Sequence, residues 1–156
     1  MESPYSFTLD PDIADNARFQ DLVRYWNRKR GARTAALKSD IDPLELKGHL
    51  GSLNVIECLP KLADFRYRLI GSRIAEAYGR DSTGRTVREL YEVADPAYCE
   101  FLLHVYTAVA TRRVIARITA TLRTVNKDYR SADSLLLPLD RGDGAVGFIL
   151  NEVLFQ

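Results

Sequence analysis

Residues 114–123 alternate between two kinds of side chain, and the alternation predicts a β-strand. Val114, Ala116, Ile118, Ala120 and Leu122 are apolar, whereas most of the residues between them are polar. Successive side chains of a strand point to opposite faces, so one face of this strand is apolar and the other is half-polar. The chain therefore contains a strand that packs against another layer on one face.

Four further strands follow from similar patterns and from turn residues between them. The run at 52–59 is rich in β-prone residues, and residues 61–64 form a turn before a strand at 65–71. In that strand Phe65, Tyr67 and Leu69 share one face, while Arg66 and Arg68 share the other. Two more strands are predicted at 129–139 and 145–150, with turns at 125–128 and 141–144.

Helices are predicted mainly from three Asp-Pro pairs, at 10–11, 42–43 and 95–96. Aspartate accepts a hydrogen bond at a helix N-cap, and proline is well suited to the first helical position. These signals predict an amphipathic helix ending near Gly31, a short helix reaching about His49, and a long helix with an apolar stripe. Ser72 is expected to cap another short helix that ends at Gly79.

The order of these elements indicates an α+β fold with one antiparallel sheet packed by helices. The length of 156 residues suits a single domain with a real core, and two cysteines without a CxxC motif predict neither disulfides nor zinc.

No run of about 18 apolar residues and no signal peptide is visible, which favours a cytoplasmic protein. The basic residues at 24–38 are best explained as a solvated helix end, so nucleic acid binding is unlikely on this pattern.

Several segments resemble the PAS superfamily, and more narrowly the stand-alone bacterial PAS_5 type. They are Tyr25-Trp26, RGARTAALKSDIDPLEL (30–46), FRYRLIGSRIAEAYGRDSTGRTVREL (65–90) and LLLPL (135–139). The likeness runs from about residue 17 to residue 150, and the middle segment is its specific part. It implies a five-stranded antiparallel sheet with helices on one face and a small cavity, preceded by the N-terminal amphipathic helix.

On this basis we divide the chain into an N-terminal helical extension (1–50) and a PAS core (51–151). The last five residues, EVLFQ (152–156), match a protease recognition sequence. They are either a remnant of a cleavage site or the end of a native strand.

The expected function is that of a non-catalytic sensory or protein-interaction module in bacterial signalling. The wall of a ligand-binding cavity is predicted to include Tyr67, Leu69, Ile74, Tyr78, Phe101, Leu102 and Val105. A polar rim that meets an anionic ligand or a partner is predicted at Arg66, Arg68, Arg73, Arg80, Asp81, Thr83 and Arg85. The expected partners are a second copy of the chain, a signalling protein and a small molecule.

No cofactor or metal is assigned from the sequence. His104 is placed away from the apolar stripe of its helix, and His49 near a helix end, so neither suits a haem ligand. Cys58 and Cys99 lack the motif of a flavin photoadduct and are expected to pack as small apolar residues.

Two alternative functions stay open. One is a ligandless dimeric scaffold, and the other is a small cone-shaped α+β enzyme with a polar pocket. A buried, convergent set of polar groups would favour the enzyme, and an apolar cavity would argue against it.

The basic face of the sheet predicts a role for the N-terminal helix. That helix, which carries Asp12, Asp15 and Asp21, or a second copy's helix is expected to cover this face and to pair with its arginines, which are Arg66 and Arg68 together with Arg117 or Arg123.

Overall fold

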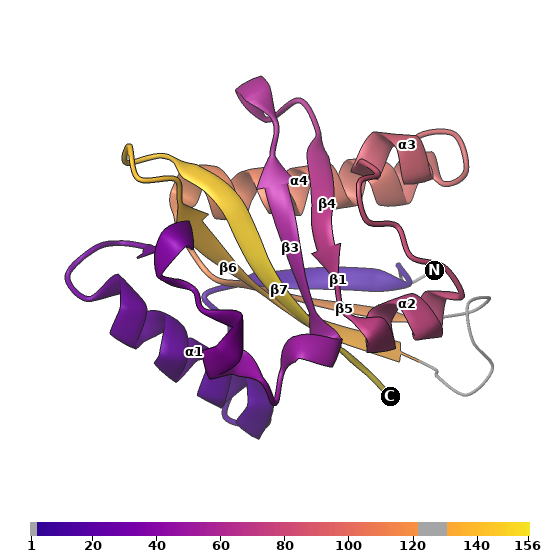
Figure 1. Cartoon of the computed structure of the whole chain (residues 1–156). Coiled ribbons are helices and arrows are strands. Elements are labelled where there is room, and N and C mark those ends of the chain that lie inside the picture. The colour runs from indigo at the N-terminus through magenta and orange to yellow at the C-terminus, as the bar shows by residue number, and fades with distance from the viewer. Residues whose placement is uncertain (1–2, 122–130) are drawn as a thin grey trace.

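The computed structural model describes residues 3–121 and 131–156 and has the predicted α+β architecture (Figure 1). Its helices are α1 (Ala17–Arg30), α2 (Ser72–Tyr78), α3 (Val87–Tyr91) and α4 (Pro96–Arg112). Its strands are β1 (Tyr5–Leu9), β2 (Ala36–Leu37), β3 (Leu53–Cys58), β4 (Phe65–Ile70), β5 (Ala116–Thr121), β6 (Ser131–Asp140) and β7 (Val146–Phe155). Short 3₁₀ turns lie at Lys38–Asp40, Pro43–Leu46, Leu50–Ser52 and Pro60–Leu62.

Within the described residues the sheet has seven strands, two more than the five expected. Six of them are antiparallel neighbours in the order β1-β5-β6-β7-β3-β4, and the short β2 pairs in parallel with the end of β6. The sequence does not predict β1, because its residues directly precede Asp10-Pro11, a helix-start signal. The predicted turn at 125–128, Leu122, Arg123 and the start of the strand expected from 129 lie outside the described residues.

The helices that follow the N-terminal one lie over a single face of the sheet, as the sequence predicts, and the N-terminal helix lies over the other face. α2, α3 and α4 lie over one face, which we call the inner face, and α1 lies over part of the other, the outer face (Figure 1). The alternation along β6 explains this arrangement: Leu136 contributes to the core under α4, whereas Leu135, Leu137 and Leu139 contribute to the core under α1.

α1 is anchored by its apolar stripe and by two aromatic hydrogen bonds. Phe19, Leu22 and Trp26 are buried against the outer face, and each such side chain stabilises the fold by about 1.5–3 kcal/mol. The Trp26 indole donates to the carbonyl of Pro138 at 2.9 Å. The Tyr25 hydroxyl donates to the Glu45 carboxylate at 3.0 Å, so the Tyr-Trp pair joins α1 to both the sheet and the Pro43–Leu46 turn.

Two of the Asp-Pro signals were only partly correct. α1 begins at Ala17, where the Asn16 side chain accepts from the Phe19 N–H at 3.0 Å, and Asp10 instead has a positive φ of 48°. Asp42 does cap its turn by accepting from the Leu44 N–H, but only 3₁₀ turns follow it.

Of the three aspartates predicted to pair with a sheet arginine, Asp15 does so, although it lies just before α1 rather than in the helix. Arg117 of β5 makes a bidentate ion pair with Asp15, at 2.8 and 2.9 Å, and another with Asp133 of β6. Asp12 gives Arg117 only its backbone carbonyl, and Asp21 pairs with His49 at 2.7 Å and with Arg24 at 3.6 Å rather than with a sheet arginine.

Residues 152–155 continue β7. Leu53 of β3 and Leu135 of β6 both pair with Glu152, whose side chain is fully buried. Among the described helices, none is long and apolar enough to cross a bilayer.

Candidate functional site

A cavity of about 70 Å³ lies between the inner face of the sheet and helices α2, α3 and α4. A water molecule needs roughly 10–15 Å³ of such space, so the cavity has room for several waters or one small molecule. Its lining consists of Asn54, Tyr67, Ile70, Ile74, Tyr78, Arg80, Ser82, Leu90, Tyr91, Tyr98, Leu102, Tyr106, Ile118, Ala120, Ala132, Ser134, Asn151 and Val153.

Two asparagines on adjacent strands line this cavity. Asn54 of β3 pairs directly with Asn151 of β7, and the two residues are only 5% and 4% exposed. Neither Oδ1 atom has a hydrogen-bond partner among the described residues. Leaving a buried polar group unsatisfied costs about 1–3 kcal/mol, so these two carboxamides require an explanation beyond folding.

Five tyrosines also line this space. The hydroxyls of Tyr67 and Tyr106 are hydrogen-bonded to each other at 3.0 Å. Burial raises the pKa of Tyr67, Tyr98 and Tyr106 well above the usual value, and it also raises the pKa of Tyr78 and Tyr91. All five are therefore neutral hydroxyls at physiological pH, able to donate and to accept hydrogen bonds.

One charged side chain joins this polar lining. Arg80 follows α2, which Gly79 ends in the left-handed conformation with φ of 73°. Its guanidinium lies beside the Tyr91 hydroxyl and acts to lower the pKa of Tyr91, against the larger effect of burial. Since Arg80 is exposed, we place it at the mouth of the cavity.

Four residues of the predicted cavity wall line the cavity: Tyr67, Ile74, Tyr78 and Leu102. Val105 is fully buried in the adjoining core and is not among the lining residues. Phe101 instead contacts Tyr5 of β1, with ring centroids 4.4 Å apart.

Leu69 was wrongly placed in the core, because β4 contains a bulge. Val55 of β3 pairs with Leu69, but the next residue, Ile56, pairs with Tyr67, so Arg68 is an extra residue. A bulge shifts the alternation by one position. Leu69 is consequently 49% exposed, and Ile70 takes the inward position beside the cavity.

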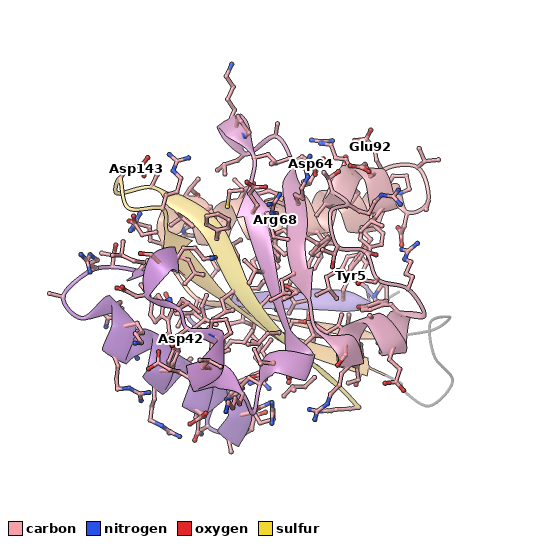
Figure 2. All side chains as sticks on the ribbon, viewed as in Figure 1. Tyr5, Asp42, Asp64, Arg68, Glu92 and Asp143 are labelled. Carbon is pink, nitrogen blue, oxygen red and sulfur yellow. The ribbon has the colours of Figure 1, made fainter. Side chains whose placement is uncertain are left out.

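Of the predicted polar rim, only Arg80 is a lining residue. Arg68 pairs weakly with Glu57 at 3.8 Å and lies on the β3–β4 part of the sheet, apart from α1 (Figure 2). The expectation that α1 covers Arg66 and Arg68 is therefore wrong.

The other members of the predicted rim have local roles. Arg66 forms a backbone bridge with Thr86, and the Arg73 side chain packs over Gly51. Arg85 pairs with Glu89 at 2.9 Å. The Asp81 carboxylate accepts from both the backbone and the hydroxyl of Thr83, so neither caps α3, whose N-cap is Thr86.

The sequence interpretation missed Asn54 and Asn151, although both leave a trace in the sequence. Each is a single carboxamide inside an apolar strand, in SLNVIECL and FILNEV. An inward polar residue on a strand is unusual enough to mark a site, but their pairing across two distant strands is visible only in the fold.

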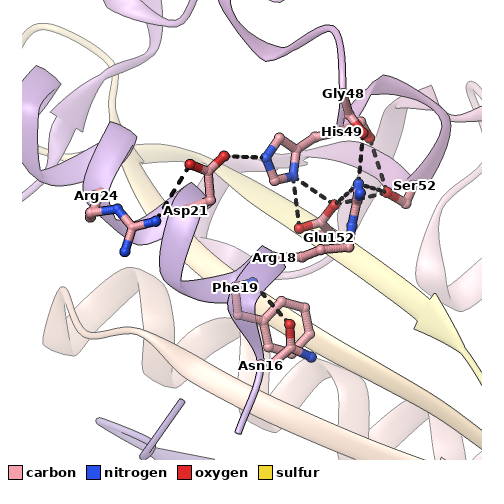
Figure 3. A network of polar contacts seen from close by, with 9 residues as sticks. All are labelled: Asn16, Arg18, Phe19, Asp21, Arg24, Gly48, His49, Ser52 and Glu152. Atoms are coloured by element: carbon pink, nitrogen blue, oxygen red, sulfur yellow. Dashed lines mark hydrogen bonds and ion pairs between the residues drawn. The ribbon is translucent and has the colours of Figure 1, made fainter. Parts of the chain in front are cut away.

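A second buried polar cluster lies on the outer face, under α1 (Figure 3). The Glu152 carboxylate accepts hydrogen bonds from Arg18 at 3.0 Å and Ser52 at 2.8 Å, and lies 2.9 Å from His49 Nδ1. The other ring nitrogen of His49 lies 2.7 Å from Asp21. His49 is thus a buried connector, rather than the helix-end residue that was expected, whereas His104 is exposed as predicted.

Metal or thiol chemistry finds no support in residues 3–121 and 131–156. No group of three or more histidine, cysteine or acidic side chains there could hold a metal ion. Burial raises the pKa of the Cys58 thiol to about 12, which keeps it protonated and unreactive at neutral pH.

The comparison with protein families agrees with this architecture. A family model described as PAS domain, PAS_5, matches residues 15–151. The chain belongs to the PAS domain family. PAS domains are generally non-catalytic sensory modules, and membership suggests a sensory or interaction role. A search of curated proteins gave no match.

Proposed function

We propose that this PAS domain binds a small polar molecule in the cavity between its sheet and α2–α4, and that it acts in bacterial signalling. A single observation supports the proposal most strongly. Asn54 and Asn151 are buried beside a cavity, and their Oδ1 atoms lack hydrogen-bond partners in the described structure. A bound polar ligand would satisfy such groups, whereas an empty apolar cavity would not need them.

The lining supports binding rather than catalysis. The lining is a buried, convergent set of polar groups, and this feature alone would favour the alternative of a small enzyme. However, the described lining residues include no carboxylate, imidazole or thiol. Acid–base catalysis works best with a pKa near the operating pH, and burial moves the tyrosines away from it.

The strands that carry the asparagines also provide a route to α1. Asn151 faces the cavity, and the next residue of β7, Glu152, faces the buried cluster that includes Arg18 of α1 and His49. Similarly, Ser52 bonds to Glu152 just before β3 begins. A ligand that binds better to one docked state of α1 would shift the population toward it, by no more than its differential affinity.

Native mass spectrometry of the purified protein tests this function. We expect a mass excess that is lost when the protein is denatured, or, for protein purified without ligand, a raised melting temperature with small polar compounds. Replacing Asn151 with Leu should abolish either signal, because it removes a carboxamide from the lining. The same spectrum measures the oligomeric state, for which the homodimer stays our prediction.

A bare mass together with unchanged melting in every small polar compound would contradict the proposal. It would favour the ligandless scaffold, in which water fills the cavity and the surface carries the function.

A further inference from the structure

The electrostatic character of the cavity selects the class of its ligand. Apart from the five tyrosines, Arg80 is the one ionisable residue among the described lining residues. Because burial keeps the tyrosines neutral, the guanidinium is the formal charge that a ligand in this cavity meets. A cationic ligand would find no counter-charge there, and burying an unpaired charge is costly.

Arg80 also lacks a carboxylate partner within the described part of the chain. Arg85 and Arg88 are paired, with Glu89 at 2.9 Å and Glu92 at 2.6 Å, whereas Arg66 and Arg73 have no ion pair among the described residues but do not line the cavity. No ion pair of the described residues includes Arg80, although it has a planar fork suited to a bidentate anion.

The interior beyond Arg80 is rich in neutral hydrogen-bonding groups. The Ser82 and Ser134 hydroxyls, the two asparagine amides and the tyrosine hydroxyls, except the one engaged between Tyr67 and Tyr106, can donate to a ligand oxygen, and the asparagine Oδ1 atoms can accept from a ligand hydroxyl. A single guanidinium balances one negative charge. A cavity of about 70 Å³ also limits the ligand to a small molecule. These features fit a monocarboxylate better than a doubly charged phosphate ester.

The geometry points to a small hydroxy-carboxylate as the ligand, with its charged end paired with Arg80 and its hydroxyl donating to the unpartnered Oδ1 of Asn54 or Asn151. This inference rests on the proposed function, since it requires that the cavity be a binding site. It selects Arg80 from the seven residues of the predicted polar rim and adds two residues that the sequence interpretation did not include.

The test compares carboxylates with amides of the same shape. Glycolate, lactate and 3-hydroxybutyrate would each be titrated against glycolamide, lactamide and 3-hydroxybutyramide, with thermal melting and calorimetry of the full chain stripped of ligand by refolding. We expect the carboxylates to bind and the amides to bind at least about tenfold more weakly, since hydrogen bonds to charged groups are the stronger ones.

Two arginine variants make a matched pair for this test. Arg80→Gln should weaken carboxylate binding by about tenfold or more. Arg73→Gln should bind like the unmodified protein, because Arg73 is exposed on α2 and is not a lining residue. Both changes are at exposed positions, so both variants should fold.

The outcomes distinguish the proposal that the cavity binds a ligand from the proposal that this ligand is a carboxylate. Equal binding of amides and carboxylates, or unchanged binding in Arg80→Gln, would overturn the carboxylate assignment and leave the cavity as a binding site. Carboxylate binding that survives Asn151→Leu would overturn this assignment, because the site would lie elsewhere. A co-purified ligand without a carboxylate, identified by mass, would also overturn it.

Discussion

Asn54 and Asn151 make a stability prediction at the level of single residues. In ligand-free protein each carries an unsatisfied Oδ1, so replacing Asn151 with Leu removes a buried polar group at similar volume. We expect the free energy of unfolding to stay within about 1 kcal/mol or to rise, measured by urea denaturation after refolding. Asn54→Leu should behave alike. A loss of about 2 kcal/mol or more in both variants would mean that these amides have partners in the protein.

The buried tyrosines predict a loss of stability at alkaline pH. Burial raises the pKa of Tyr67, Tyr98 and Tyr106 in the folded protein. Their contribution is therefore fully present below the unfolded value near pH 10 and is lost as the pH rises above it. The urea midpoint should fall steeply above about pH 10 and less steeply in Tyr98→Phe. A flat profile to higher pH would contradict the burial of these hydroxyls.

Single residues of the site were predictable where the local pattern survives in the fold. Tyr67 and Leu102 follow strand and helix periodicity, and both line the cavity. Leu69 follows the same strand pattern but is turned outward by the bulge at Arg68, which leaves no clear mark in the sequence.

At the level of elements, the connection between β4 and α2 depends on the close approach of Gly71 to the backbone of Gly51. A Cβ at Gly71 would collide with the carbonyl of Gly51, because the chain after β4 packs closely on the Leu50–Ser52 turn. We expect Gly71→Ala to lower the free energy of unfolding by about 1–3 kcal/mol. Gly48→Ala is the control, since a Cβ there meets open space, and it should be close to neutral. Equal effects would show that this close approach is not a constraint.

The cluster under α1 predicts a large cost for losing Glu152. This carboxylate is fully buried and holds Arg18, Ser52 and His49, so Glu152→Ala would leave buried donors without a partner. The loss should be about 3 kcal/mol in thermal or urea unfolding, the low end for a broken buried pair because Arg18 is partly exposed.

The exposed ion pair between Glu92 and Arg88 provides the comparison, and Glu92→Ala should cost less than about 1 kcal/mol. Similar losses in Glu92→Ala and Glu152→Ala would mean that Glu152 does not hold α1 against the sheet.

A helix or strand could be predicted from the sequence where a local signal alone determines where it begins. Asp95-Pro96 begins α4, and the Asp95 side chain accepts from the Tyr98 N–H as expected. Asp10-Pro11 carries the same signal but follows β1, whose pairing with β5 is a long-range contact. The capping residue then becomes Asn16, so the same dipeptide had two outcomes in different tertiary surroundings.

At the scale of the molecule, the α+β class could be inferred from the order of the helices and strands, and the family from sequence motifs. The site could not be inferred in this way. The cavity is made where β3 and β7 pair, since this pairing sets Asn54 opposite Asn151. Such a register depends on contacts between distant segments, which periodicity along the chain does not specify. The two faces of β7 then place the cavity and the α1 cluster back to back.

The crystal structure of the protein as purified is the most direct test of a ligand in this cavity. We predict density for a small molecule that is hydrogen-bonded to Asn54 and Asn151 and reaches Arg80. Ordered water that satisfies both carboxamides, with no other density between the sheet and α4 either in the protein as purified or in crystals soaked with lactate, would contradict it.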